Sequence, residues 1–269
     1  MESSKSCYEP KKLYHYTTSQ AFISILEHKK IWVTNYRFLN DYKELILAIK
    51  LAHTHSKFDD SYKASLDFLE REPFNLAIFS LSQDKDLLSQ WRSYCPGGGY
   101  AIGFDFHKLE KILRKRGFTG LKRCIYDEKE QLKIIDNFAE NLPLSPVSSS
   151  GSEHLIINIH KFLQEVGLLI KHNSFQEENE WRAISNNKSP IFNSTNESKW
   201  KVREKDKRLI PFLEVDLKDE ADFPICEIVI GPCRDQELAK QAVEVALKAY
   251  EIEMPKDALS LSNIPYRNY

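Results

Sequence analysis

Two acidic residues stand two positions apart where an apolar strand is expected to begin. Glu178 and Glu180 lie in KHNSFQEENEWR (171–182), next to the apolar run at 181–184. In an extended segment, residues spaced by two share one face. One such carboxylate can hold a substrate hydroxyl or stabilise a developing cation, while the other orients a nucleophile. An exposed pair without a catalytic role is the competing interpretation.

A histidine and a threonine form a second candidate group near the N-terminus. His15 and Thr17 alternate with Tyr14 and Tyr16 in the predicted strand LYHYT (13–17), so they should share the face opposite to the tyrosines. An imidazole and a hydroxyl on one face can bind a ribose diol, because each offers a donor and an acceptor. A hydrogen-bonded core histidine is the alternative.

Two further segments carry polar or aromatic groups in suggestive positions. Ser80 and Ser82 share one face of the predicted strand FNLAIFSLS (74–82). Trp91 and Arg92 are adjacent in the helix predicted from Asp84 through Tyr94. This pair is chemically suited to stacking on a flat ring and pairing with a phosphate.

The glycine run and the histidines do not match known cofactor motifs. Gly97–Gly99 follow a predicted helix and open a strand, which is the reverse of a dinucleotide-binding fingerprint, so we expect a helix terminator and a tight turn. His53 and His55 have no carboxylate or cysteine partner at ligand spacing. We therefore expect neither a Rossmann fold nor a metal site.

The composition limits the partners and the compartment. The chain of 269 residues has 38 basic and 39 acidic residues, so no overall field attracts nucleic acid or anionic lipid. Its five cysteines are scattered and never spaced as Cys-x-x-Cys, which favours a reducing compartment. No apolar run is long enough to cross a membrane. A cytoplasmic protein is expected.

The order of the predicted elements indicates the fold class. Strands are scattered among helices with few strand-helix-strand repeats, which predicts α+β rather than a doubly wound sheet. The proline- and serine-rich stretch at 141–152 predicts a flexible surface loop rather than a domain boundary. We expect a single domain over residues 1–269.

Five segments carry a resemblance to known families. They are YHYTT, IWVTNYRFLND, FSLSQDKDLLSQWRSY, GGGYAIGFD and FQEENEWR. Over residues 13–231 the chain resembles an uncharacterised bacterial family, domain of unknown function 2971. The order of the segments is in turn similar to the ADP-ribosyltransferase superfamily. That likeness implies split mixed or antiparallel sheets with flanking helices, and NAD as a cosubstrate bound without metal.

The resemblance implies a role for each candidate residue. Glu180 would bind the nicotinamide ribose, and Glu178 would orient an acceptor. The other implied NAD contacts are His15 with Thr17 at the adenosine ribose, Ser80 and Ser82 at the nicotinamide end, Arg37 and Arg92 at the pyrophosphate, and Trp91 stacked on a ring.

The implied reaction is transfer of ADP-ribose to an unknown macromolecular acceptor, protein or nucleic acid. By analogy the setting would be a toxin, an effector or a phage-defence protein, and a toxin could have a neutralising partner. Attack by water would make the same site an NAD glycohydrolase. A different class is a non-enzymatic nucleic-acid or ligand-binding module, whose contact patch would be Lys199, Lys201, Arg203, Lys205, Lys207 and Arg208. A nuclease is a third possibility, although no paired-metal motif is visible.

Overall fold

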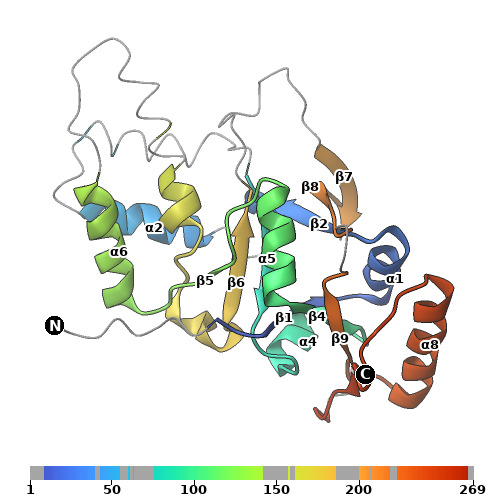
Figure 1. Cartoon of the computed structure of the whole chain (residues 1–269). Coiled ribbons are helices and arrows are strands. Elements are labelled where there is room, and N and C mark those ends of the chain that lie inside the picture. The colour runs from blue at the N-terminus through green and yellow to red at the C-terminus, as the bar shows by residue number, and fades with distance from the viewer. Residues whose placement is uncertain are drawn as a thin grey trace. The chain divides into compact units, whose positions relative to one another are not determined.

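The computed structural model describes residues 9–39, 43–54, 60, 63, 76–141, 157, 161–185, 200–205, 207–218 and 223–265. Within these residues the fold is α+β with an open mixed sheet and several helices, which confirms the predicted class (Figure 1). The helix predicted at 61–70 and the loops predicted at 141–152 and 186–198 lie outside the described residues, apart from Lys63 and Asn141. No helix of the described part is long and apolar enough to span a membrane.

The chain divides into two compact units, each built from stretches that are far apart in sequence. Unit 1 comprises 1–31, 80–112 and 216–269, and unit 2 comprises 32–79 and 113–215. The boundary falls inside two strands, β2 (Lys30–Asn35) and β3 (Ala77–Ser82). Nothing in the composition had indicated this division of the predicted single domain.

Unit 1 is built on five neighbouring strands in the order β10-β9-β4-β1-β3. Strands β9 and β10 are parallel, and the pairs β9–β4, β4–β1 and β1–β3 are antiparallel. The strands are β1 (Lys12–Thr17), the end of β3, β4 (Tyr100–Asp105), β9 (Ile225–Ile230) and β10 (Leu259–Leu261). The helices are α1 (Ser19–His28), α4 (Leu88–Tyr94), most of α5 (Phe106–Lys115) and α8 (Gln236–Ala249).

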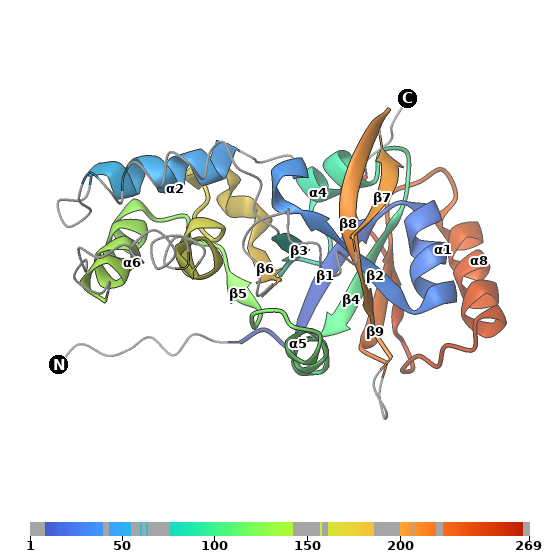
Figure 2. The ribbon, with the colours of Figure 1, turned by 90° about the horizontal axis from the view of Figure 1, so that it is seen from above.

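Helix α1 shows how the sequence directs the local structure of unit 1. Thr18 caps its start by accepting a hydrogen bond from the Ala21 amide, and the helix ends at Lys29 in the left-handed region with φ 54°. Its buried residues Phe22, Ile25 and Leu26 recur at helical spacing. Helices α1 and α8 are neighbours and lie side by side in Figure 2.

Unit 2 has a second set of strands. Four of them are neighbours in the order β7-β8-β2-β3. Strand β6 pairs with β3, and β5 pairs with β6. The additional strands are β5 (Lys122–Arg123), β6 (Glu180–Ile184), β7 (Trp200–Lys205) and β8 (Arg208–Asp216). The helices and helical turns are α2 (Lys43–Thr54), α6 (Glu128–Glu140), the 3-10 turns η1 (Tyr36–Phe38) and η3 (Asn173–Glu178), and the π-helical turn η2 (Leu163–Gly167).

The core of unit 2 forms where α2, α6 and the segment around η2 pack their apolar faces together. Helices α2 and α6 lie next to each other in Figure 2. The cluster includes Ala48 and Ala52 of α2, Ile135 of α6, and Phe162 and Leu163, each fully buried. Small residues on α2 let the larger side chains approach closely, which gives the dense packing that a core requires.

Two local predictions in unit 1 have clear outcomes. The predicted glycine turn is confirmed, because Gly97 (φ 83°) and Gly98 (φ 126°) connect the end of α4 to β4 in a conformation that favours glycine. The predicted start of a helix capped by Asp84 was wrong. Helix α4 begins at Leu88 and has no side-chain cap, while the Asp84 amide donates to Ser82 Oγ in the preceding turn.

Candidate functional site

The two acids of the Glu-x-Glu segment lie on different local structures. Glu178 is the last residue of the 3-10 turn η3, Asn179 adopts the left-handed region (φ 42°), and Glu180 is the first residue of β6. The extended geometry predicted for this segment was therefore wrong. The reversal at Asn179 nevertheless brings both carboxylates to one cation, Lys171, which precedes η3.

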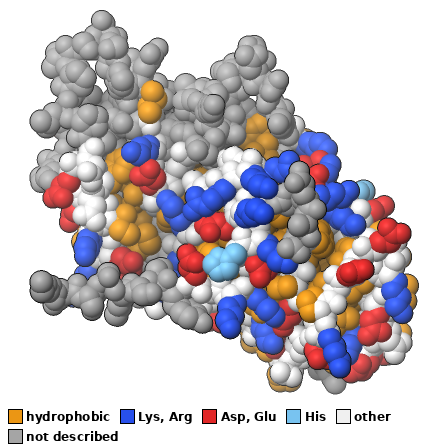
Figure 3. All heavy atoms as spheres, in the orientation of Figure 1, with side chains coloured by type: hydrophobic (Ala, Val, Ile, Leu, Met, Phe, Trp, Pro, Cys, Tyr) orange, Lys and Arg blue, Asp and Glu red, His pale blue; other side chains and the backbone are white. Residues whose placement is uncertain are grey.

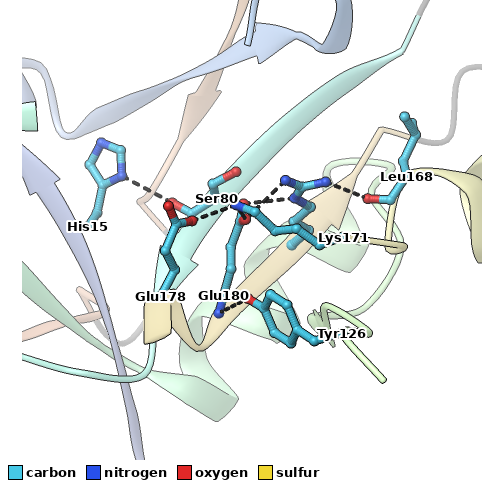
Figure 4. Close-up of polar contacts among 8 residues, drawn as sticks. His15, Ser80, Tyr126, Leu168, Lys171, Glu178 and Glu180 are labelled. Carbon is cyan, nitrogen blue, oxygen red and sulfur yellow. Dashed lines mark hydrogen bonds and ion pairs between the residues drawn. The ribbon is translucent and has the colours of Figure 1, made fainter. Parts of the chain in front are cut away.

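Lys171 lies between the two acids in unit 2 (Figure 4). Its side chain is only 1% exposed, and its Nζ donates to Glu178 Oε2 and, over 2.7 Å, to Glu180 Oε2. The ammonium also lies 5.0 Å from the centre of the Phe175 ring, within the range of a cation–π contact. An ammonium this deeply buried requires close anionic partners, and the two glutamates supply them.

Glu180 is held from its other side by Arg182. Nε and Nη2 of Arg182 donate to Glu180 Oε1 and Oε2 over 2.7 and 2.9 Å, and Nη1 donates to the Leu168 carbonyl over 2.8 Å. Burial alone would raise the pKa of Glu180, but the charges of Arg182 and Lys171 and their hydrogen bonds outweigh it and lower the pKa to about 2. Glu180 is thus a buried carboxylate that is ionised at neutral pH.

Glu178 differs from Glu180 in its access to solvent. Its side chain is 18% exposed, against 9% for Glu180. Glu178 follows an exposed turn, whereas Glu180 starts a strand whose five residues are all buried. Of the two acids, Glu178 is the one that a ligand can reach without opening the core.

Sequence reasoning gave no role to the residues that hold this cluster in place. Lys171 and Tyr126 are the main examples: the Tyr126 hydroxyl accepts from the Glu180 amide over 2.9 Å, and burial raises the pKa of that hydroxyl. The side chain of Gln131 donates to the carbonyls of Ile125 and Lys171, each over 2.8 Å, and so links the two segments that carry Tyr126 and Lys171. The available signal for Lys171 was a lysine directly after the apolar run Leu168–Ile170, where a buried ammonium needs an acid nearby.

His15, in unit 1, is half-buried on β1. Its Nδ1 lies 3.2 Å from the Ser80 carbonyl oxygen (Figure 4). A carbonyl oxygen only accepts, so Nδ1 donates, and Nε2 of the neutral ring is the acceptor. The predicted neighbours His15 and Ser80, 65 positions apart in sequence, are therefore adjacent in the fold.

The serine hydroxyls do not join His15 on one face. Ser82 stands directly opposite Tyr14 in the antiparallel β1–β3 pair, so the two side chains share a face. His15 follows Tyr14 and points to the other face. The Ser82 hydroxyl accepts from the Asp84 amide over 3.1 Å, and Thr17 is buried with 6% exposure. The contact of β3 with the imidazole is through the Ser80 backbone.

Trp91 and Arg92 of α4 differ in their exposure to solvent. Trp91 is completely buried, packs edge-on against Tyr16 with ring centres 4.6 Å apart, and donates from Nε1 to Asp86 over 2.7 Å. Arg92 is exposed. Trp91 therefore presents no ring face for stacking on a nucleotide, contrary to the predicted role. Arg37 is half-buried in η1, where its amide donates to Asn35 Oδ1 over 3.1 Å.

The cationic patch predicted for a nucleic-acid module falls on the hairpin β7–β8 in unit 2. Lysine and arginine side chains reach the surface in the region where Figure 1 places these strands (Figure 3). Lys201 pairs with Glu214 over 2.7 Å, and the Arg203 guanidinium lies 5.4 Å from the Trp32 ring and donates to Thr34 Oγ1 over 3.0 Å. Lys199 lies outside the described residues. Two of the predicted contacts are thus engaged within the protein.

The histidine pair His53 and His55 was not expected to bind a metal ion. His53 is half-buried on α2, and His55 lies outside the described residues. Among the residues that the structure describes, no group of three or more histidine, cysteine, aspartate or glutamate side chains could hold a metal ion.

Comparison with known proteins gives one match. Residues 90–183 match the family model described as a protein of unknown function, DUF2971. The match begins within α4 and ends within β6, so it includes Lys171, Glu178, Glu180 and Arg182. It supports the resemblance to this family that the sequence segments indicated. No curated protein and no solved structure matches the chain significantly.

Proposed function

We propose that the protein is an NAD-dependent ADP-ribosyltransferase in which Glu178 is the catalytic carboxylate. The observation that carries this proposal is the charge cluster of unit 2. Lys171 and Arg182 hold two carboxylates at the start of β6, and Glu178 alone of the two remains 18% exposed. A preorganised carboxylate at a solvent-accessible edge is what stabilisation of a developing cation requires.

The chemistry of NAD cleavage explains the need for such a group. As the bond between nicotinamide and ribose breaks, its electron pair leaves with nicotinamide and positive charge develops on the ribose. A fixed carboxylate beside the ribose binds this state more tightly than the ground state. We assign this role to Glu178, because Glu180, the first choice from sequence, has both oxygens engaged by Arg182 and Lys171.

The residues fit NAD only in part. Within unit 2, Glu178 offers a partly exposed carboxylate that can accept from a ribose hydroxyl. Trp91 and Ser82 do not fit their implied roles, since Trp91 is completely buried and the Ser82 hydroxyl caps a local turn. The NAD contacts that we propose within unit 2 are therefore Glu178 and, as a cation for the phosphates, Arg37.

Transfer and hydrolysis differ only in the group that takes up the ribose. With an acceptor present, its nucleophile forms the new bond to ribose and loses a proton. With water in that position, the products are ADP-ribose and nicotinamide. The glycohydrolase is therefore the second candidate, and it depends on the same carboxylate.

The direct test is chromatography of NAD incubated with the purified protein, alone and with bacterial protein or RNA. We expect free nicotinamide, with ADP-ribose attached to an acceptor in a transferase and free in a glycohydrolase. Glu178→Gln should lower the rate of nicotinamide release at least about 100-fold, because it removes the charge that stabilises the transition state.

Glu177→Gln is the matched control, since Glu177 is the exposed neighbour of Glu178 on the same 3-10 turn. It should retain the wild-type rate. NAD that stays intact under every condition would refute both enzymatic candidates. A Glu178→Gln variant as active as the control would refute the assignment of the carboxylate.

A further inference from the structure

We infer that Lys171 is a positioning residue for Glu178 and that the Glu-x-Glu pair works as a chain of alternating charges rather than as two equivalent acids. The inference concerns the same site and rests on the proposed function for its kinetic consequence. Its geometric part stands on contacts within unit 2 alone.

The contacts form a series of four charged side chains that ends at the most exposed one, Glu178. Arg182, 3% exposed, donates through two nitrogens to Glu180, which is 9% exposed. Glu180 in turn accepts from Lys171, which is 1% exposed, and Lys171 donates to Glu178, which is 18% exposed. The two inner charges, Glu180 and Lys171, each lie between two opposite charges, and Glu178 at the end of the series is the most accessible.

The two glutamates do not depend equally on Lys171. Glu180 keeps a two-nitrogen contact with Arg182 whatever happens to Lys171. Glu178 is the last residue of the 3-10 turn η3, before the left-handed Asn179, and its Oε2 accepts from Lys171 Nζ. The specific effect of Lys171 is therefore on Glu178, while Glu180 holds Lys171 itself.

Lys171 cannot leave this arrangement easily. Its ammonium is enclosed by the two carboxylates and the Phe175 ring, and its own amide and carbonyl are hydrogen-bonded to the Ile125 carbonyl and to Gln131. Anchored at backbone and side chain, Lys171 can hold a carboxylate within the narrow tolerance that a reacting group needs. The same enclosure argues against Lys171 itself meeting a substrate.

The kinetic test compares Lys171→Met with Lys171→Arg. We expect Lys171→Met to lower kcat for nicotinamide release about 100-fold, with a KM for NAD within about threefold of wild type, because misplacement of a catalytic group affects chemistry more than binding. Lys171→Arg keeps the charge, so its kcat should be at least about tenfold higher than that of Lys171→Met. Lys133→Met, the same change at an exposed position of α6, should behave as wild type.

A second test does not depend on activity. Carboxyl groups are labelled with a water-soluble carbodiimide and an amine, and the labelled residues are identified by peptide mass spectrometry. In Lys171→Met, Glu178 should be labelled at least about tenfold faster than in wild type, because a carboxylate without its cation protonates more readily. In Lys133→Met the labelling rate of Glu178 should be unchanged.

The two tests separate the inference from the proposed function. Faster Glu178 labelling in Lys171→Met, with no nicotinamide released by the wild-type protein, would support the charge chain and refute the NAD reaction. Labelling of Glu178 at the wild-type rate in a folded Lys171→Met variant would overturn the inference. If that variant does not fold, the ¹⁵N resonance of Lys171 Nζ gives the answer, since it should shift in Glu178→Gln, and an unchanged resonance would overturn the inference.

Discussion

At the scale of single residues, the buried carboxylate of Glu180 is a determinant of stability. Its burial is compensated by Arg182 and Lys171, which hold its pKa at about 2. Removing the Glu180 charge is costly, because its two cationic partners are then left uncompensated in a medium of low polarity. The free energy of unfolding therefore depends on whether Glu180 is ionised.

The first prediction concerns Glu180→Gln. At pH 7 we expect the free energy of unfolding to fall by about 3–5 kcal/mol, since Lys171 and Arg182 lose a buried partner. Glu177→Gln, an exposed change of the same kind, should stay within about 0.5 kcal/mol of wild type. Urea denaturation followed by circular dichroism measures both values.

The pH dependence gives a second readout of the same group. The pKa of Glu180 is lowered in the folded protein from 4.5 to about 2, so the ionised side chain stabilises the fold above pH 4.5. This contribution, on the order of 3 kcal/mol, is lost as the pH falls from about 4.5 towards 2. Glu180→Gln should therefore lose less stability than wild type over that range. Parallel acid titrations of the two proteins would contradict the assignment.

The residue scale also shows what could be inferred from sequence. Glu178 and Glu180 stood out because two acids enter an apolar strand, and Arg182 was recognisable as a partner of Glu180. Their joint attachment to Lys171 depends on the left-handed turn at Asn179, which no periodic pattern reveals. Trp91 and Arg92 were grouped because they are adjacent, but neighbours in a helix point about 100° apart, and only Arg92 reaches the surface.

At the scale of elements, the connection between α4 and β4 depends on close backbone approach. A Cβ on Gly99 would lie 2.5 Å from the Thr17 carbonyl oxygen and 2.8 Å from Cys95 Cβ. The carbonyl belongs to β1, which is held by its pairing with β4, so it cannot move away. At Gly97, by contrast, nothing lies within 4 Å and only the φ of 83° is restrictive.

We therefore expect Gly99→Ala to lower the free energy of unfolding by at least about 2 kcal/mol, through overpacking against fixed backbone. Gly97→Asn should cost less than about 1 kcal/mol, because asparagine tolerates the left-handed region. Thermal and urea unfolding of the two variants provide the comparison. Equal losses would mean that conformational strain, rather than the contact with Thr17, limits this turn.

Individual strands were the features of the fold that the sequence predicted best. Strand β1, predicted at 13–17, and strand β6, predicted from the apolar run at 181–184, lie close to their observed bounds, because alternating or continuous apolar residues mark them. The short β10 and the 3-10 turn η3 were missed. They have three and six residues, which is too short for a hydrophobic period to show.

At the scale of the whole molecule, neither unit is continuous in sequence. Unit 2 joins 32–79 to 113–215, and its core cluster takes Ala48, Ala52 and Ile78 from the first stretch and Ile135, Phe162 and Ile184 from the second. Strand β6 pairs with β3, and the Ser185 amide donates to the Ala77 carbonyl over 2.8 Å. Patterns in a single sequence identify elements but not which distant stretches share a core, so this organisation was beyond their reach.

A fragment of residues 113–215 should therefore not fold by itself. It would retain the acid cluster but lack the strands and the helix that complete its core. We expect a narrow range of amide shifts in a ¹H–¹⁵N spectrum and no cooperative thermal transition. Co-expression with the fragment 32–79 should restore the wide range of amide shifts. A dispersed spectrum and a sharp transition for 113–215 alone would disprove the interdependence of the two stretches.

The interleaving of the two units also sets the order in which they can be completed on the ribosome. All of unit 2 has been translated once Val215 is joined, while unit 1 still awaits β9 and β10 in residues 216–269. At about 5–20 residues per second, that interval is roughly 3 to 11 seconds. During that time strand β4 lacks its neighbour β9. The sheet of unit 1 is therefore incomplete in the nascent chain throughout that interval.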